Sequence, residues 1–110
     1  MVIVRQEQPE DVAAIRDITQ QAFGSPLEAR LIEALRARGQ ITLSLVAEYD
    51  QHLVGHCLFS PVRLTSAGQV GTLVGLGPMA VLPVKQRQGI GTRLITHGLE
   101  HCRRAGYAGG

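Results

Sequence analysis

The sequence predicts a single mixed α/β (α+β) domain, with a mostly antiparallel sheet flanked by helices. Three observations predict it. Apolar residues recur at helical spacing between residues 9 and 39. Between residues 41 and 81 they alternate with polar residues or form β-branched runs, which is typical of strands. A glycine-rich turn then leads into a third helical pattern, so the expected order is strand, helix, helix, strand, strand, strand, helix.

Length and composition limit the class of protein. With 110 residues, 45% of them hydrophobic and 18% charged, the chain suits one small globular domain. A net charge of +2 gives no argument for nucleic-acid binding. No run approaches the roughly 20 apolar residues of a membrane span, and the N-terminus lacks the apolar core of a signal peptide. We therefore expect a cytoplasmic protein that binds neither nucleic acid nor membrane.

The first half of the chain predicts one strand and two helices. The strand is expected at residues 1–5, and the first helix from Pro9 to Phe23. Ser25, Pro26 and Glu28 predict that the second helix begins with a capping box. The apolar residues of the two helices recur at helical spacing: Val12, Ile15, Ile18, Ala22 and Phe23 in the first, and Leu27, Leu31 and Leu35 in the second.

The second half predicts a three-stranded meander and a helix. The strands are expected at residues 43–49, 52–64 and 72–81, joined by turns at 50–51 and 66–69. Because Pro78 has no N–H to donate, we expect its strand to be unpaired or bulged there. The last helix is expected from near Gly89 to Ala105. Its predicted buried face consists of Ile90, Leu94, Ile95, Leu99 and Cys102.

The turn at residues 86–91, Gln-Arg-Gln-Gly-Ile-Gly, is a candidate anion site. The first N–H groups of a helix have no intrahelical partner, and the helix dipole places partial positive charge there. Gly89 and Gly91 would let a phosphate approach the backbone, and Lys85 and Arg87 add positive charge. The turn therefore predicts a pyrophosphate site. The alternative is an ordinary glycine turn between a strand and a helix.

Cysteine and histidine residues do not predict a metal site. Cys57 and Cys102 lack metal-ligand spacing and are interpreted as small core residues. His97 and His101 lie four residues apart on the last predicted helix, but no third ligand is evident. We expect no metal.

Residues 79–94 resemble the acyl-CoA signature of the GNAT superfamily of N-acyltransferases. The family pattern Gln/Arg-x-x-Gly-x-Gly/Ala is met by Gln86, Gly89 and Gly91. Segments 56–62 and 76–81 also resemble a bacterial YhbS-like branch. The expected element order corresponds to the N-terminal two-thirds of that fold. The resemblance thus implies that residues 1–110 are one N-acetyltransferase domain lacking its C-terminal strands. Either the chain is a fragment or another chain completes it, and its exposed sheet edge predicts a homodimer or aggregation.

The resemblance implies transfer of an acetyl or acyl group from acyl-CoA to an amine of a small molecule or protein. Met79, Ala80 and Val81 would bind the pantetheine arm through the strand backbone. The pyrophosphate would be surrounded by the turn and the first helical residues: Gln86, Arg87, Gln88, Gly89, Ile90, Gly91 and Thr92. The resemblance implies acetyl-CoA as co-substrate, with no metal and no covalent enzyme intermediate.

The general base is the least defined part of the expected site. The strand before the signature has no Asp or Glu, which leaves His56 and Glu48 as candidate catalytic residues. His56 is the better chemical candidate, since its ordinary pKa is near neutrality. A structural role is the alternative for both, and Tyr107 lies too early to be the family's acidic tyrosine. Two other functions stay open: a catalytically incomplete acyl-CoA binder, and a structural or interaction domain.

Overall fold

The computed structural model describes residues 1–66 and 69–106, with side chains described outside residues 62–74. The elements follow the predicted order: β1 (Val2–Gln6), α1 (Val12–Phe23), α2 (Leu27–Ala37), β2 (Leu43–Tyr49), β3 (His52–Ser66), β4 (Gln69–Val81) and α3 (Ile90–Arg104). Single 3-10 turns, η1 (Pro9–Asp11) and η2 (Pro83–Lys85), precede α1 and α3. The predicted mixed α/β class is therefore confirmed.

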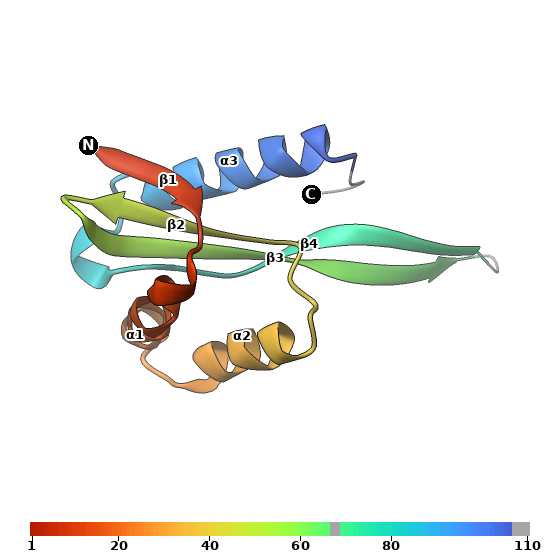
Figure 1. Ribbon diagram of the computed structural model, residues 1–110, viewed down its shortest axis with the longest axis horizontal. Helices are drawn as coiled ribbons and strands as arrows, with labels where there is room; N and C mark the ends of the chain where they lie inside the picture. The colour runs from red at the N-terminus through yellow and green to blue at the C-terminus, as the bar shows by residue number, and fades with distance from the viewer. Residues whose placement is uncertain (67–68, 107–110) are drawn as a thin grey trace.

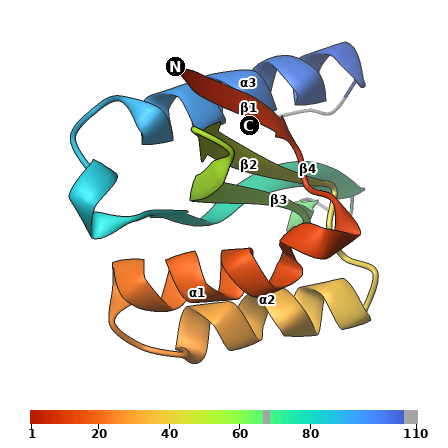
Figure 2. The same ribbon diagram turned by 60° about the vertical axis from the view of Figure 1, so that its left-hand side comes forward.

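The four strands form one antiparallel sheet in the order β1-β2-β3-β4. Figure 1 shows that the β3–β4 hairpin extends well beyond the rest of the sheet, and the molecule measures 48 × 27 × 25 Å. In Figure 2, α3 covers one face of the sheet, while α1 and α2 cover the other. β4 is the last strand of this sheet, so one of its edges has no strand beside it among the described residues.

Each face of the sheet has its own hydrophobic cluster, because successive strand residues point to opposite faces. Under α3, Cys57 and Phe59 pack with Leu94. Under α1 and α2, Val46 and Leu58 pack with Ile15 and Ile32 of the two helices. The β2–β3 turn at residues 50–51 is as predicted. In the second predicted turn, Ser66 and Gln69 instead belong to β3 and β4 and pair with each other, and residues 67–68 lie outside the described residues.

The predicted buried face of α3 is correct at three of its five positions, and Ile95 is only half-buried. Ile90, Leu94 and Cys102 are buried, but Leu99 is 37% exposed, and Gly98 lies against the sheet instead. A Cβ atom at Gly98 would be 2.1 Å from Cε2 of Phe59, so the aromatic ring occupies the space of the missing side chain. A sequence pattern that counts apolar side chains does not detect a glycine in this role.

The predicted apolar stripe of α2 is correct only at Leu35, which is half-buried against the cluster of Val46 and Leu58. Leu27 and Leu31 are 65% and 51% exposed, whereas Ala29 and Ile32 are each 3% exposed. Both sets satisfy helical spacing, and packing against α1 and the sheet selects the second. In α1, likewise, Phe23 is 44% exposed although its spacing predicts burial.

The predicted capping box at the start of α2 is absent. Helix α2 begins at Leu27, whose N–H donates to Ser25 Oγ at 3.2 Å, and its N-cap residue, Pro26, makes no side-chain hydrogen bond to the helix. A capping box forms instead before η1, where Asp11 Oδ2 accepts a hydrogen bond from the Gln8 N–H at 2.7 Å. Among the described residues, no helix is both long and apolar enough to cross a membrane.

Candidate functional site

A pocket of about 310 Å³ lies where the end of β4 meets the start of α3. Eight of the ten predicted cofactor residues line it, the exceptions being Ala80, which is buried, and Gln88, which is exposed. The complete lining consists of Met79, Val81, Lys85, Gln86, Arg87, Gly89, Ile90, Gly91, Thr92 and Ile95. The fold thus brings the predicted strand segment and the predicted turn to one cavity.

A bulge in β4 lies immediately before this pocket. Cys57 pairs with Met79 and Phe59 pairs with Leu76, so two residues of β4 face one residue of β3. The two are Gly77 and Pro78, as expected for a proline that cannot donate to the sheet. After the bulge, residues 79–81 pair again with β3, and their other edge has no strand beside it among the described residues.

The turn between β4 and α3 is held in place by hydrogen bonds. The Leu82 N–H donates to the Val54 carbonyl at 2.9 Å, and Gln86 Nε2 donates to the Val81 carbonyl at 3.0 Å. Arg87 and Gly89 have left-handed backbones, with φ of 66° and 81°. Gly89 is the N-cap residue of α3, and no side chain caps this helix. The N–H groups of its first turn are therefore available to an anion.

Gly91 has a packing role as well as a predicted binding role. A Cβ atom at this position would be 3.1 Å from Cε of Met79, which is tighter than an ordinary contact. The glycine therefore lets the end of β4 lie close to the start of α3. This close approach forms one wall of the pocket.

Two cations line the pocket, Lys85 and Arg87. Among the described residues, neither makes an ion pair with a carboxylate, in contrast to Arg5, Arg36 and Arg104. Lys85 Nζ instead lies 4.1 Å from the centroid of the Tyr49 ring. The rim of the pocket thus carries positive charge that no described acidic side chain neutralises.

His56 does not line the pocket. It is fully buried, with Nε2 2.8 Å from Ser44 Oγ, and Ser44 Oγ donates to Glu7 Oε1 at 2.5 Å. Because that hydroxyl proton goes to the carboxylate, Nε2 of the neutral histidine carries the proton and donates to Ser44. Among the described residues, Nδ1 has no hydrogen-bond partner. Burial lowers the pKa of His56 to about 4, so the ring is neutral at pH 7.

Glu7 connects this histidine to α2. Arg36 forms a two-pronged salt bridge with the Glu7 carboxylate. Burial alone would raise the pKa of Glu7, but the bonds from Arg36 and Ser44 hold it below its ordinary value. We call Glu7, Arg36, Ser44 and His56 the polar network. Sequence analysis identified only its histidine, because the other three residues belong to no motif.

Glu48 also lies outside the pocket lining. Arg5 Nε donates to Glu48 Oε1 at 3.2 Å, and Arg5 Nη1 donates to Asp11 Oδ2 at 2.8 Å. The carboxylate of Glu48 is thus engaged by an arginine of the neighbouring strand. The predicted catalytic roles of His56 and Glu48 stay predictions, and the structure brings neither side chain to the pocket.

The cysteines, the metal-ligand residue types and Tyr107 are the other candidates that the sequence analysis considered. Cys57 and Cys102 are buried, and burial raises the pKa of the Cys57 thiol to about 12, which leaves no thiolate near neutral pH. Across the described ranges 1–66 and 69–106, no three His, Cys, Asp or Glu side chains come together as metal ligands. Tyr107 lies outside the described residues.

The chain is similar to known proteins of one family. A family profile for the Acetyltransferase (GNAT) domain matches residues 3–108. The uncharacterized N-acetyltransferase YhbS of Escherichia coli is 35% identical over 108 residues, which are 97% of this chain. The chain spans only 64% of the length of that relative.

Two solved structures are also similar. A GNAT family acetyltransferase from Brucella melitensis, solved in complex with acetyl-CoA, is 43% identical with a TM-score of 0.89. The match covers 97% of this chain and 71% of that one. Escherichia coli YhbS, solved in complex with CoA, is 34% identical with a TM-score of 0.87, over 96% of this chain and 58% of that one.

Proposed function

The chain belongs to the GNAT acetyltransferase family, and we propose that it transfers an acetyl or other acyl group from acyl-CoA to an amine of a small molecule or protein. The pocket between β4 and α3 carries this proposal, because it joins an uncapped helix N-terminus to a free strand edge. The acetyl-CoA and CoA bound to the two solved relatives support it.

The residues present suit the two ends of acyl-CoA. Backbone groups of residues 79–81 on the free edge of β4 would hydrogen-bond the amides of the pantetheine arm. The N–H groups at the start of α3, beside Lys85 and Arg87, would hold the pyrophosphate. A second chain pairing with β4 would compete for the same edge, so the predicted homodimer and ligand binding are alternatives there.

Acyl-CoA would supply the activated thioester. The amine nitrogen would bond to its carbonyl carbon, the carbon–sulfur bond would break, and the proton lost by the nitrogen would end on the CoA thiolate. The chain itself would position the arm and donate a backbone N–H to the oxygen on which charge develops. His56 and Glu48 remain the proposed sources of a base. Neither lines the pocket, and because His56 is fully buried, only Glu48 has the exposure needed to act through water.

Calorimetric titration with acetyl-CoA tests the binding part of this proposal. We expect the folded protein to bind, and Gly89→Val to lose binding, because a β-branched side chain at φ of 81° disturbs the turn and blocks phosphate approach. Gly39→Val is the matched control, since Gly39 also has a left-handed backbone, with φ of 66°, but does not line the pocket. A folded protein without affinity for acetyl-CoA would overturn the proposal, as would unchanged affinity in Gly89→Val.

A thiol-release assay with a panel of amines then separates an enzyme from a binder. Amine-dependent release of CoA would support the transferase. Binding without release for any amine would favour the catalytically incomplete acyl-CoA binder. A folded chain that does neither would leave the structural or interaction domain.

A further inference from the structure

We propose that Tyr49 is a positioning residue for the nucleotide end of acyl-CoA, because its ring holds the Lys85 ammonium at the pocket rim for a phosphate of the ligand. The proposal rests on the proposed function, since it assumes that this pocket takes acyl-CoA. It adds a residue outside the glycine-rich turn, from a different part of the chain. Tyr49 ends β2, 36 positions before Lys85.

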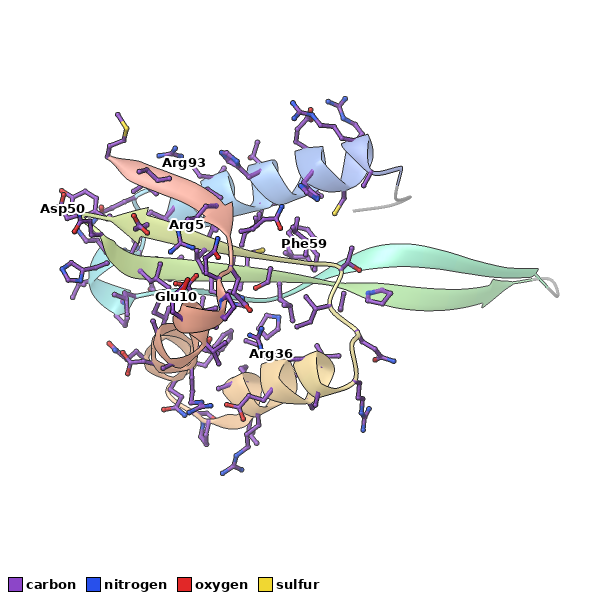
Figure 3. The ribbon with its side chains drawn as sticks, in the orientation of Figure 1. Arg5, Glu10, Arg36, Asp50, Phe59 and Arg93 are labelled. Carbon is purple, nitrogen blue, oxygen red and sulfur yellow. The ribbon has the colours of Figure 1, made fainter. Side chains whose placement is uncertain are left out.

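The β2–β3 turn places the tyrosine ring. Tyr49 pairs with His52 across a two-residue turn, in which Asp50 and Gln51 both have left-handed backbones, with φ of 49° and 65°. Figure 3 labels Asp50 at the tip of this turn, at the same end of the molecule as the loop that carries η2. The ring packs against the hydrophobic cluster under α3, so the core fixes its position.

The lysine backbone is fixed as well. Lys85 ends η2, and its N–H donates to the Leu82 carbonyl at 2.8 Å. The flexible part is therefore the four-carbon side chain, which loses conformational entropy when its ammonium is held by a ligand. An ammonium 4.1 Å from a ring centroid is within cation–π distance. The ring thus restricts the lysine before the ligand arrives, which reduces the entropy lost on binding.

Lys85 differs from Arg5 and Arg36 in its partner, which is an aromatic ring and not a carboxylate. A carboxylate partner, such as those of Arg5 and Arg36, neutralises the cation and would compete with a phosphate. An aromatic ring attracts the ammonium through its quadrupole and leaves the positive charge in place. No carboxylate in the described part of the chain makes an ion pair with Lys85. Lys85 is therefore held in position and keeps its full charge for an anion.

Titration calorimetry with acetyl-CoA tests the proposal through a double-mutant cycle. We expect Tyr49→Leu, which keeps an apolar side chain, to weaken binding about two- to fivefold. Tyr49→Phe keeps the ring and should bind like the wild type. Lys85→Met should weaken binding about tenfold, and adding Tyr49→Leu to it should cause no further loss. Arg38→Met, which removes an exposed positive charge at the end of α2, is the matched control and should bind normally.

The phosphate that meets Lys85 is identified by repeating the cycle with dephospho-acetyl-CoA, which lacks the ribose phosphate. A Tyr49→Leu effect confined to acetyl-CoA would assign the ribose phosphate, and an equal effect on both would assign the pyrophosphate. Wild-type affinity in Tyr49→Leu would overturn the proposal, as would an undiminished effect in the Lys85→Met background. Failure of the wild type to bind acetyl-CoA would instead overturn the proposed function, and this inference with it.

Discussion

The two faces of the sheet carry different kinds of chemistry. On the face under α3, the residues that line the candidate site come from one contiguous segment, residues 79–95. On the face under α1 and α2, the polar network is made of side chains from four separate places in the chain. Figure 3 shows Phe59 on the α3 side of the sheet and Arg36 on the α2 side. One face offers free donors to a ligand, whereas the other satisfies most of its polar groups internally.

This difference predicts how each face of the sheet responds to changes in packing and in pH. The α3 face is apolar up to the pocket, so its helix is held against the sheet by packing, and its N-terminus is placed rigidly. The opposite face contains a buried histidine and a carboxylate, so its stability depends on protonation. Changes in packing should therefore destabilise either face, whereas pH should act on the face under α1 and α2.

The largest effect is expected from filling the space at Gly98. Because a Cβ atom there would be 2.1 Å from the Phe59 ring, Gly98→Leu should push α3 away from the sheet. We expect a loss of about 4 kcal/mol in the free energy of unfolding, measured by urea denaturation. Thr96→Leu, at an exposed position of the same helix, is the control and should change stability by less than about 0.5 kcal/mol. Equal stability of the two variants would show that Phe59 is not packed against this glycine.

A pair of neighbouring residues on α2 gives the next effect. Ile32→Ala should cost about 3 kcal/mol, because Ile32 is 3% exposed and its loss leaves a cavity in the cluster with Val46. Leu31→Ala should cost less than about 0.5 kcal/mol, since Leu31 is 51% exposed. Urea denaturation of both variants compares the observed face of α2 with the face that the sequence predicts. A larger loss in Leu31→Ala would reverse the assignment.

These two helices show how far the sequence determines the fold. Strand alternation, the turn at residues 50–51 and the bulge at Pro78 depend on local chemistry, and they were predicted correctly. Which side of a helix is buried depends on the partner surface. The sequence of α2 has two sets of residues at helical spacing, and either set could form the buried face. The apolar pattern of α3 does not reveal that Gly98 contacts Phe59.

The candidate site, too, is predictable from the sequence only where it depends on local chemistry. The predicted turn and strand line one pocket because the signature is contiguous and its backbone geometry is local. Glu7, Arg36 and Tyr49 were not predicted to act with it or with His56. They reach their partners only after β1, α2 and the β2–β3 turn have assembled. Sequence reasoning therefore found the contiguous segment that lines the pocket, and it missed the side chains that long-range pairing brings close to His56 and to Lys85.

The smallest effect is a dependence of stability on pH that belongs to the α1 and α2 face. Burial lowers the pKa of His56 from 6.5 to about 4, so between these values the unfolded chain binds a proton that the folded chain does not. Stability should thus fall by about 2 kcal/mol from pH 7 to pH 5. The pKa of Glu7 lies below 4.5, so the stability that Glu7 contributes is lost only at lower pH. Urea denaturation at both pH values measures the change, and His56→Gln, which cannot titrate, should remove it. A His56→Gln variant with the same pH dependence would assign the titration to a different group.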